Sequence, residues 1–259
     1  MVHGAGFNDE KAVSERKYVA MDKKNTAAVV LAAGQGKRMQ SSVAKQFLLL
    51  AGEPVVCHAL RAFEESEVDT VVLVTGADEI AYCRKEIVEK YGFQKVVDVV
   101  AGGKERYHSV YEGLCALAGG LEVDGIVLIH DGARPMVTQE IIARTVEAAK
   151  AYGACVAAMP VKDTIKVADS DGFAAATLAR STLWQIQTPQ TFQYNLVFGA
   201  YKKLLSDEAY QKGITDDAMV VESMCGGHVK LVEGSYENIK VTTPEDMIAA
   251  ESFLKRRMV

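Results

Sequence analysis

Cysteine is scarce and scattered in this sequence, with five residues among 259 and no CxxC pair. The five are Cys57, Cys83, Cys115, Cys155 and Cys225. A disulfide framework or a structural zinc site needs closely spaced, paired cysteines, so this spacing argues against both. Isolated thiols are typical of a reducing compartment, and we therefore expect the protein in the cytoplasm.

Long apolar runs and an excess of positive charge are also missing. No segment approaches the roughly 18 apolar residues that a membrane-spanning helix requires. The formal net charge is −5, whereas proteins that bind nucleic acid or anionic membranes normally carry a basic surface. We therefore expect neither nucleic acid nor membrane as a partner. Residues 1–25 are polar and lack the apolar core of a secretory signal, which predicts a disordered extension before one domain over residues 26–259.

From residue 26 onward, apolar runs alternate with segments of helical periodicity. The runs at 27–32, 70–75, 95–100, 125–130 and 154–159 indicate strands, and the spacing at 55–65, 78–91, 106–118 and 138–152 indicates helices. This alternation predicts an α/β fold with a doubly wound, mostly parallel sheet. Ligands bind at the carboxyl ends of such strands, so the loops after Ala32, Val100, His130 and Met159 should converge on one site.

The alternation stops after Pro160. Residues 161–183 contain short polar and β-branched pieces around a turn at residues 169–172, which predicts a two-stranded β-arm leaving the main body. An isolated hairpin is marginally stable in water, so we expect the arm to pack against a second protomer. The remaining chain predicts a helix at 216–224, strands near 229–232 and 238–241, and a final helix after Pro244.

The loop after the first apolar run has the composition of a phosphate-binding loop. It contains Gly34 and Gly36, and Arg38 and Lys45 follow closely. Glycines let main-chain N–H groups approach an anion, and the cations neutralise it. The third glycine of a dinucleotide fingerprint is replaced by Met39, and no P-loop pattern is present. The two cations therefore favour a nucleoside triphosphate.

Eight motifs in order resemble the 2-C-methyl-D-erythritol 4-phosphate cytidylyltransferase family of the non-mevalonate isoprenoid pathway. They are LAAGQGKRM, AKQF, AGGKERYHSV, HDGARP, PVKDTIK, QTPQTF, ITDDA and ENIKVTTPEDM, and they extend from about Thr26 to the C-terminus. Ala44 and Phe47 stand where the family usually has Pro and Tyr, and Gly132 stands where it has Ala.

The resemblance implies a Rossmann-like nucleotidyltransferase that transfers CMP from CTP to 2-C-methyl-D-erythritol 4-phosphate and releases pyrophosphate. It implies catalytic roles for Arg38, Lys45, Arg180 and Lys240. The nucleotide would be held by Ala32, Ala33, Gly34, Gly36, Arg38, Lys45, Gly103, Lys104, Arg106, Ser109 and Asp131. The acceptor would be held by Arg134, Thr164, Arg180, Thr188, Glu237 and Lys240. Asp131 would also bind Mg²⁺ or another divalent cation, and the arm would join two chains in a homodimer that shares its sites.

Without the resemblance, most of these motifs have simpler explanations. AGGKER is then an exposed turn before a helix, and Arg180 is a surface charge on a hairpin. Thr188 belongs to a strand-to-turn transition. The acidic pair Asp216 and Asp217 marks a helix N-terminus, an explanation at least equal to a metal-binding role. His130 packs at a strand end instead of taking part in catalysis.

Three other functions compete with the implied one. A cytidylyltransferase acting on ribitol 5-phosphate or a related pentitol phosphate would share the nucleotide motifs, although Ala133 and the acidic pair favour methylerythritol phosphate. A non-catalytic nucleotide-binding module would not need Arg38, Lys45, Arg180 and Lys240 together. A sugar-nucleotide glycosyltransferase would need a DxD metal motif. Here that spacing occurs only at residues 169–171, beside a turn glycine.

Overall fold

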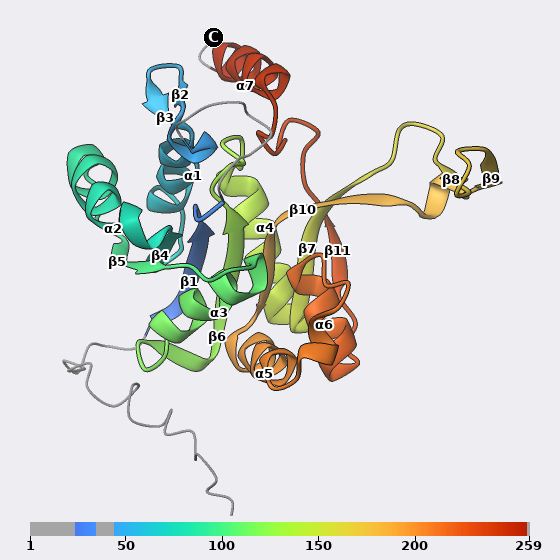
Figure 1. Ribbon diagram of the computed structural model, residues 1–259. Coiled ribbons are helices and arrows are strands. Elements are labelled where there is room, and N and C mark those ends of the chain that lie inside the picture. Colours follow the sequence, from blue (N-terminus) through green and yellow to red (C-terminus); the bar gives the residue numbers. More distant parts are fainter. Residues whose placement is uncertain (1–23, 35–43, 258–259) are drawn as a thin grey trace, which may run out of the picture.

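The computed structural model describes residues 24–34 and 44–257, and a central sheet organises them (Figure 1). Its strands run in the order β11-β7-β10-β6-β1-β4-β5. They are β1 (Lys24–Leu31), β4 (Thr70–Thr75), β5 (Val96–Ala101), β6 (Leu121–Asp131), β7 (Ala154–Pro160), β10 (Trp184–Gln193) and β11 (Lys230–Glu233). All neighbouring pairs are parallel except those of β10, which is antiparallel to β6 and β7. This confirms the predicted mostly parallel α/β sheet.

Helices cover both faces of the sheet (Figure 1). On one face lie α1 (Val55–Glu64), α4 (Gln139–Tyr152), and α2 (Ile80–Tyr82), which continues as a π-helix over Cys83–Glu89. On the other face lie α3 (Arg106–Ala116), α5 (Tyr194–Leu205) and α6 (Asp217–Cys225). Successive residues of β1 alternate between the two cores, with Ala28 and Val30 in one and Ala27 and Val29 in the other. A strand buried on both faces explains the unbroken apolar run.

A third, smaller core lies above the carboxyl edge of the sheet. It joins Ala250 of α7 (Pro244–Arg257) to Leu50, Val55 and Val241. Leu50 belongs to a small antiparallel pair, β2 (Leu49–Leu50) and β3 (Glu53–Pro54). Short 3₁₀ turns occupy Lys45–Phe47, Ala77–Glu79, Arg180–Thr182 and Glu208–Gln211. Within the described residues, no helix combines the length and apolarity that crossing a membrane requires.

Two predictions about the C-terminal half are wrong. Residues 238–241 form no strand, because Asn238 donates its N–H to Ser235 and Val241 donates its N–H to Ala133, outside any sheet ladder. Thr188 is not at a strand-to-turn transition but inside β10, where a cis peptide bond joins it to Pro189. We did not predict β10 or α5. The run of buried glutamine and threonine in β10 shows no apolar alternation.

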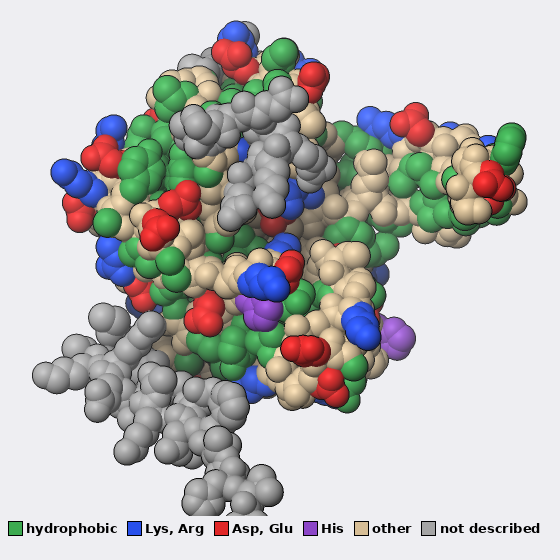
Figure 2. Space-filling view, viewed as in Figure 1, with side chains coloured by type: hydrophobic (Ala, Val, Ile, Leu, Met, Phe, Trp, Pro, Cys, Tyr) green, Lys and Arg blue, Asp and Glu red, His purple; other side chains and the backbone are tan. Residues whose placement is uncertain are grey.

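The predicted arm is present and stands clear of the body (Figures 1 and 2). It leaves at the end of β7, returns into β10, and contains the antiparallel pair β8 (Lys166–Ala168) and β9 (Ala174–Thr177). At its tip, the carboxylate of Asp169 accepts N–H bonds from Asp171 and Phe173. All of residues 162–182 are exposed, including Phe173 with 73% of its surface accessible.

Candidate active site

A pocket of about 610 Å³ lies at the carboxyl edge of the sheet. Its walls come from the ends of β1 and β6, the loop after β5, the turn at Lys45 and the segment before α7. It is lined by Leu31, Ala32, Ala33, Gly34, Lys45, Gln46, Gly103, Lys104, Glu105, Arg106, Ser109, Asp131, Ala133 and Lys240. The loops predicted to follow Ala32, Val100 and His130 therefore converge here. The loop predicted after Met159 leads into the arm instead.

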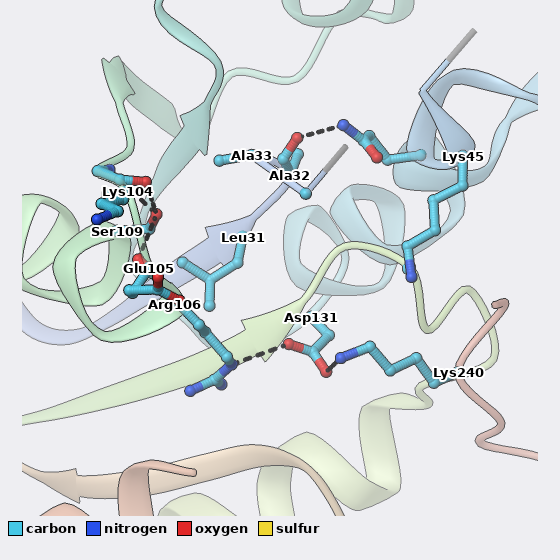
Figure 3. Close-up of a pocket in the computed structure, with 14 residues that line it drawn as sticks. Leu31, Ala32, Ala33, Lys45, Lys104, Glu105, Arg106, Ser109, Asp131 and Lys240 are labelled. Carbon is cyan, nitrogen blue, oxygen red and sulfur yellow. Dashed lines mark hydrogen bonds and ion pairs between the residues drawn. The ribbon is translucent and has the colours of Figure 1, made fainter. Parts of the chain in front are cut away.

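Within the described residues, every nucleotide-binding residue implied by the resemblance lines this pocket. The predicted residues Gly36 and Arg38 lie outside the part of the chain that the structure describes. Lys45 reaches into the pocket opposite Arg106, and Lys240 enters from a third direction (Figure 3). Three cations far apart in the sequence therefore meet around one space.

The end of β1 is held in place by a side chain that sequence reasoning missed. Ala32 donates its N–H to Val74 at 2.6 Å, and its carbonyl accepts a bond from the Gln46 side chain. Gln46 is 2% exposed although it is polar. It thereby ties the turn that bears Lys45 to the loop after β1. The only sequence signal that could have pointed to Gln46 was its position next to Lys45.

The loop after β5 is compact because its glycines leave no room for side chains. Gly102 donates its N–H to Thr75, and Gly103 donates its N–H to the Ser109 hydroxyl at 3.2 Å. A Cβ atom on Gly103 would lie 2.4 Å from the Cβ of His108. The loop therefore presents main-chain groups to the pocket in a fixed shape.

Asp131, at the end of β6, is the electrostatic centre of the pocket (Figure 3). Its Oδ2 atom lies 2.8 Å from Lys240 Nζ and 3.7 Å from Arg134 Nε, and its Oδ1 atom lies 3.5 Å from Arg106 Nε. Burial alone would raise the pKa of this carboxyl. The three positive charges outweigh burial and hold the pKa well below its usual range, so Asp131 is ionised at physiological pH.

Behind Asp131, a buried hydrogen-bond chain orients the strand end. Thr188 Oγ1 accepts the N–H of Asp131 at 3.1 Å. The hydroxyl hydrogen of Thr188 is donated to Nδ1 of His130 at 3.0 Å. His130 Nε2 then donates to the carbonyl of Arg134 at 3.2 Å. The His130 ring also packs edge-on against Phe63. This confirms the packing role expected for His130. Thr188 supports Asp131 from behind, and its contact with the acceptor stays a prediction.

Burial lowers the pKa of His130 to about 4 from an ordinary value of 6.5. The unfolded chain therefore takes up a proton between these pH values while the folded chain does not. The free energy of unfolding should fall by about 3 kcal/mol from pH 6.5 to pH 4 on account of this group. Urea unfolding curves at both pH values check this. In His130→Gln, the decrease in the free energy of unfolding between these pH values should be smaller by about 3 kcal/mol. The control His228→Gln removes an exposed histidine and should show the same decrease as the wild type.

The residues expected to hold the acceptor lie in three different places. Arg134 borders the pocket: its Nη1 donates to the carbonyl of Asn238 at 2.8 Å, and its Nε is buried without a hydrogen-bond partner. Glu237 pairs with Arg256 and Arg257 at the C-terminal end of α7.

Thr164 and Arg180 lie on the exposed arm, where Arg180 Nη1 donates to the carbonyl of Lys162. The fold of one chain does not bring these two residues into its own pocket.

Asn238 is a second polar residue that sequence reasoning missed. It is fully buried, and its amide donates to the carbonyl of Thr188 at 2.9 Å and to the side chain of Gln187 at 3.3 Å. It therefore joins the segment that carries Lys240 to β10.

The two acids at the start of α6, Asp216 and Asp217, make different contacts in the structure. Asp216 is the N-cap and accepts the N–H of Met219 at 2.9 Å, as predicted for a helix N-terminus. Asp217 instead binds both Nη atoms of Arg106 at 2.7 Å and accepts the hydroxyl of Tyr201. Burial and the Asp217 charge raise the pKa of Tyr201 well above its ordinary value, so the hydroxyl stays protonated. No signal in the sequence links these three residues.

With this geometry established, comparison with known proteins identifies the family. A profile of the IspD family, described as 2-C-methyl-D-erythritol 4-phosphate cytidylyltransferase, matches residues 26–256. The chain belongs to this family. It is 47% identical over 233 residues to a 2-C-methyl-D-erythritol 4-phosphate cytidylyltransferase of Alkaliphilus oremlandii, covering 90% of this chain and 96% of that one. To the protein of the same description from Pelotomaculum thermopropionicum, identity is 51% over 240 residues, covering 92% and 96%.

Solved structures agree with this assignment. The crystal structure of 4-diphosphocytidyl-2C-methyl-D-erythritol synthase from Anaerococcus prevotii superposes with a TM-score of 0.77 at 34% identity, covering 90% of this chain and 97% of that one. The chain is therefore an enzyme, a nucleotidyltransferase. The family match favours methylerythritol phosphate over ribitol 5-phosphate as the acceptor, and it also decides against the non-catalytic module and the glycosyltransferase.

Proposed function

We propose that the pocket around Asp131 carries out the reaction of this family, in which CMP passes from CTP to 2-C-methyl-D-erythritol 4-phosphate. The products are 4-diphosphocytidyl-2-C-methyl-D-erythritol, an isoprenoid precursor, and pyrophosphate. The observation that supports this most is the convergence of Lys45, Arg106 and Lys240 from separate elements on one pocket of about 610 Å³. A triphosphate and a second phosphate need such a concentration of positive charge before they can approach each other.

The pocket has distinct places for the two ends of CTP. The compact loop at residues 102–105, together with Ser109, holds the cytosine through main-chain groups. The main chain of residues 32–34 and the cation Lys45 hold the triphosphate, and Lys240 holds the acceptor phosphate near the α-phosphorus. Arg38, which the resemblance assigns to the triphosphate, would act from the same loop.

The chemistry requires alignment and charge neutralisation more than proton transfer. The acceptor phosphate is anionic at pH 7, so it attacks the α-phosphorus of CTP in line without a general base. Negative charge grows on the leaving pyrophosphate, and Lys45 stabilises it, while Lys240 aligns the attacking phosphate. The placement of His130 behind the strand end, away from the pocket lining, agrees with a reaction that uses no histidine base.

Asp131 suits Mg²⁺. The described residues contain no cluster of three His, Cys, Asp or Glu side chains that could enclose a metal. Mg²⁺ does not need one, because it commonly binds one or two carboxylates together with substrate phosphates and water. Asp131, ionised at the pocket wall, would hold the ion with the phosphates of CTP, and the bound ion supplies further positive charge to the triphosphate.

We infer that the arm completes the acceptor site of a second chain in a homodimer. Thr164 and Arg180 lie on the arm, whereas Lys240 lines the pocket and Arg134 lies beside Asp131 at its wall. The arm also exposes apolar side chains, of Ile165, Val167, Phe173 and Leu178. Such a surface is typical of a protein–protein contact. Since none of the five cysteines forms a disulfide, we place this dimer in the reducing cytoplasm.

Pyrophosphate release tests the proposed function. With CTP and a divalent cation, the purified protein should release pyrophosphate when 2-C-methyl-D-erythritol 4-phosphate is present and release very little with ribitol 5-phosphate or without acceptor. Equal turnover of both acceptors, or no turnover of methylerythritol phosphate, would contradict the proposed function.

A further inference from the structure

The contact between Arg106 and Asp217 links the pocket to the interior of the protein. Arg106 lines the pocket, while Asp217 is 0% exposed at the start of α6. Their side chains form a two-pronged pair, with Nη1 to Oδ1 and Nη2 to Oδ2 both at 2.7 Å. Tyr201, also fully buried in α5, donates its hydroxyl to Oδ1 of the same carboxylate. The N-terminus of α3 is thereby joined to α5 and α6.

This arrangement determines which part of Arg106 faces the pocket. Both Nη atoms are directed to Asp217, so the Nε atom is the one that approaches Asp131, at 3.5 Å. Without Asp217, the two Nη atoms would be able to pair with both oxygens of Asp131. That pairing would compete with Lys240, which bonds Oδ2 at 2.8 Å.

Stability alone does not account for a buried carboxylate at this position. Asp216 already caps α6, so Asp217 is not needed to begin the helix. Removing two charges from water is costly, and well-packed apolar residues often replace a buried ion pair without loss of stability. The pair does hold the guanidinium of a pocket residue in one orientation, with a fork geometry that, among side chains, a carboxylate matches.

We propose that Asp217 is a positioning residue of the nucleotide site, acting through Arg106, with Tyr201 orienting its carboxylate. The proposal rests on the proposed function, because it needs CTP to bind in the pocket that Arg106 lines. Asp217 holds Arg106 at the first residue of α3, directly after the loop that contacts the base. It also leaves the Oδ2 atom of Asp131 to Lys240.

The substitution Asp217→Asn tests this by separating the kinetic constants for the two substrates. Displacement of a binding group by about 1 Å can cost about 100-fold, so we expect the KM for CTP to rise by about 10-fold to 100-fold. The KM for the acceptor should change by less than about twofold, since Asp217 does not contact that part of the pocket. A purely structural role would lower the amount of folded enzyme and leave both KM values unchanged.

Two further variants keep the test decisive if Asp217→Asn folds poorly. Tyr201→Phe removes only the hydroxyl that donates to Asp217, and it should raise the KM for CTP in the same direction by a smaller factor. Asp216→Asn is the matched control. It changes the neighbouring acid, and asparagine also caps helices well, so the KM for CTP should stay at its wild-type value.

A double-variant cycle identifies Arg106 as the route of the effect. Arg106→Ala should raise the KM for CTP, and adding Asp217→Asn to it should cause no further rise. Additive effects, or an unchanged KM for CTP in folded Asp217→Asn and Tyr201→Phe, would overturn the proposal. If Arg106→Ala itself leaves the KM for CTP unchanged, the assignment of this pocket to the nucleotide is what fails.

Discussion

Replacing Lys45 by alanine is expected to lower kcat by about 10²–10³-fold, the usual cost of removing one preorganised electrostatic partner of a transition state. Lys45 lines the pocket and reaches into it opposite Arg106 (Figure 3). It is partly exposed, so it contributes little to the core, and the variant should unfold at nearly the wild-type temperature. Steady-state pyrophosphate release and a thermal melt measure the two quantities.

Lys150→Ala is a suitable control for this experiment. Lys150 is an exposed lysine of α4 that pairs with Glu147 on the same helix. Its loss removes the same formal charge from the protein and should leave kcat unchanged. A Lys45→Ala enzyme with full activity would contradict the role of charge neutralisation in the pocket.

Mixing two inactive variants is expected to restore about a quarter of the wild-type activity, because a twofold dimer can share each site between body and arm. Lys45→Ala damages the body, and Arg180→Ala damages the arm. In a mixed dimer, one site combines an intact body with an intact arm, whereas the other site carries both substitutions. Half of the randomly formed dimers are mixed, and each has one working site of two.

The mixing experiment requires subunit exchange, for example by refolding the variants together. Activity is measured against each variant refolded alone. The control mixes Lys45→Ala with Lys240→Ala, two body substitutions that no exchange of arms can complement. If the first mixture is as inactive as the control, or if sedimentation shows an active monomer, the site is not shared between chains.

Most of the body of the fold was predictable because buried parallel strands have an unmistakable composition. The predicted strand at 70–75 coincides with β4, and the predicted helices at 55–65 and 138–152 match α1 and α4 to within one residue. The strand β1 starts at Lys24, earlier than expected. Strand β10 was missed because buried polar side chains such as Thr188 and Gln190 are satisfied by tertiary hydrogen bonds, which a local pattern does not reveal.

The candidate site was predictable where it depends on loops and unpredictable where it depends on buried polar contacts. The glycine-containing loops and the cations Lys45 and Lys240 were predicted and lie together at the pocket. Gln46 and Asn238 were not predicted as parts of it, and the contact of Asp217 with Arg106 was not predicted either. Each is polar and nearly or fully buried, and each acts on a residue distant in the sequence or on a neighbouring loop.

The sequence by itself determined the order of the strands and helices up to β7, the edge of the sheet that carries the pocket, and the family of the enzyme. Those properties follow from local periodicity and from motifs that keep their order along the chain. Only the tertiary structure decided which charges neutralise which, since Arg106 meets Asp217 across 111 positions and Lys240 meets Asp131 from a separate segment. The free energy of an ion pair depends on distance and burial in three dimensions, and neither can be read from positions along a chain.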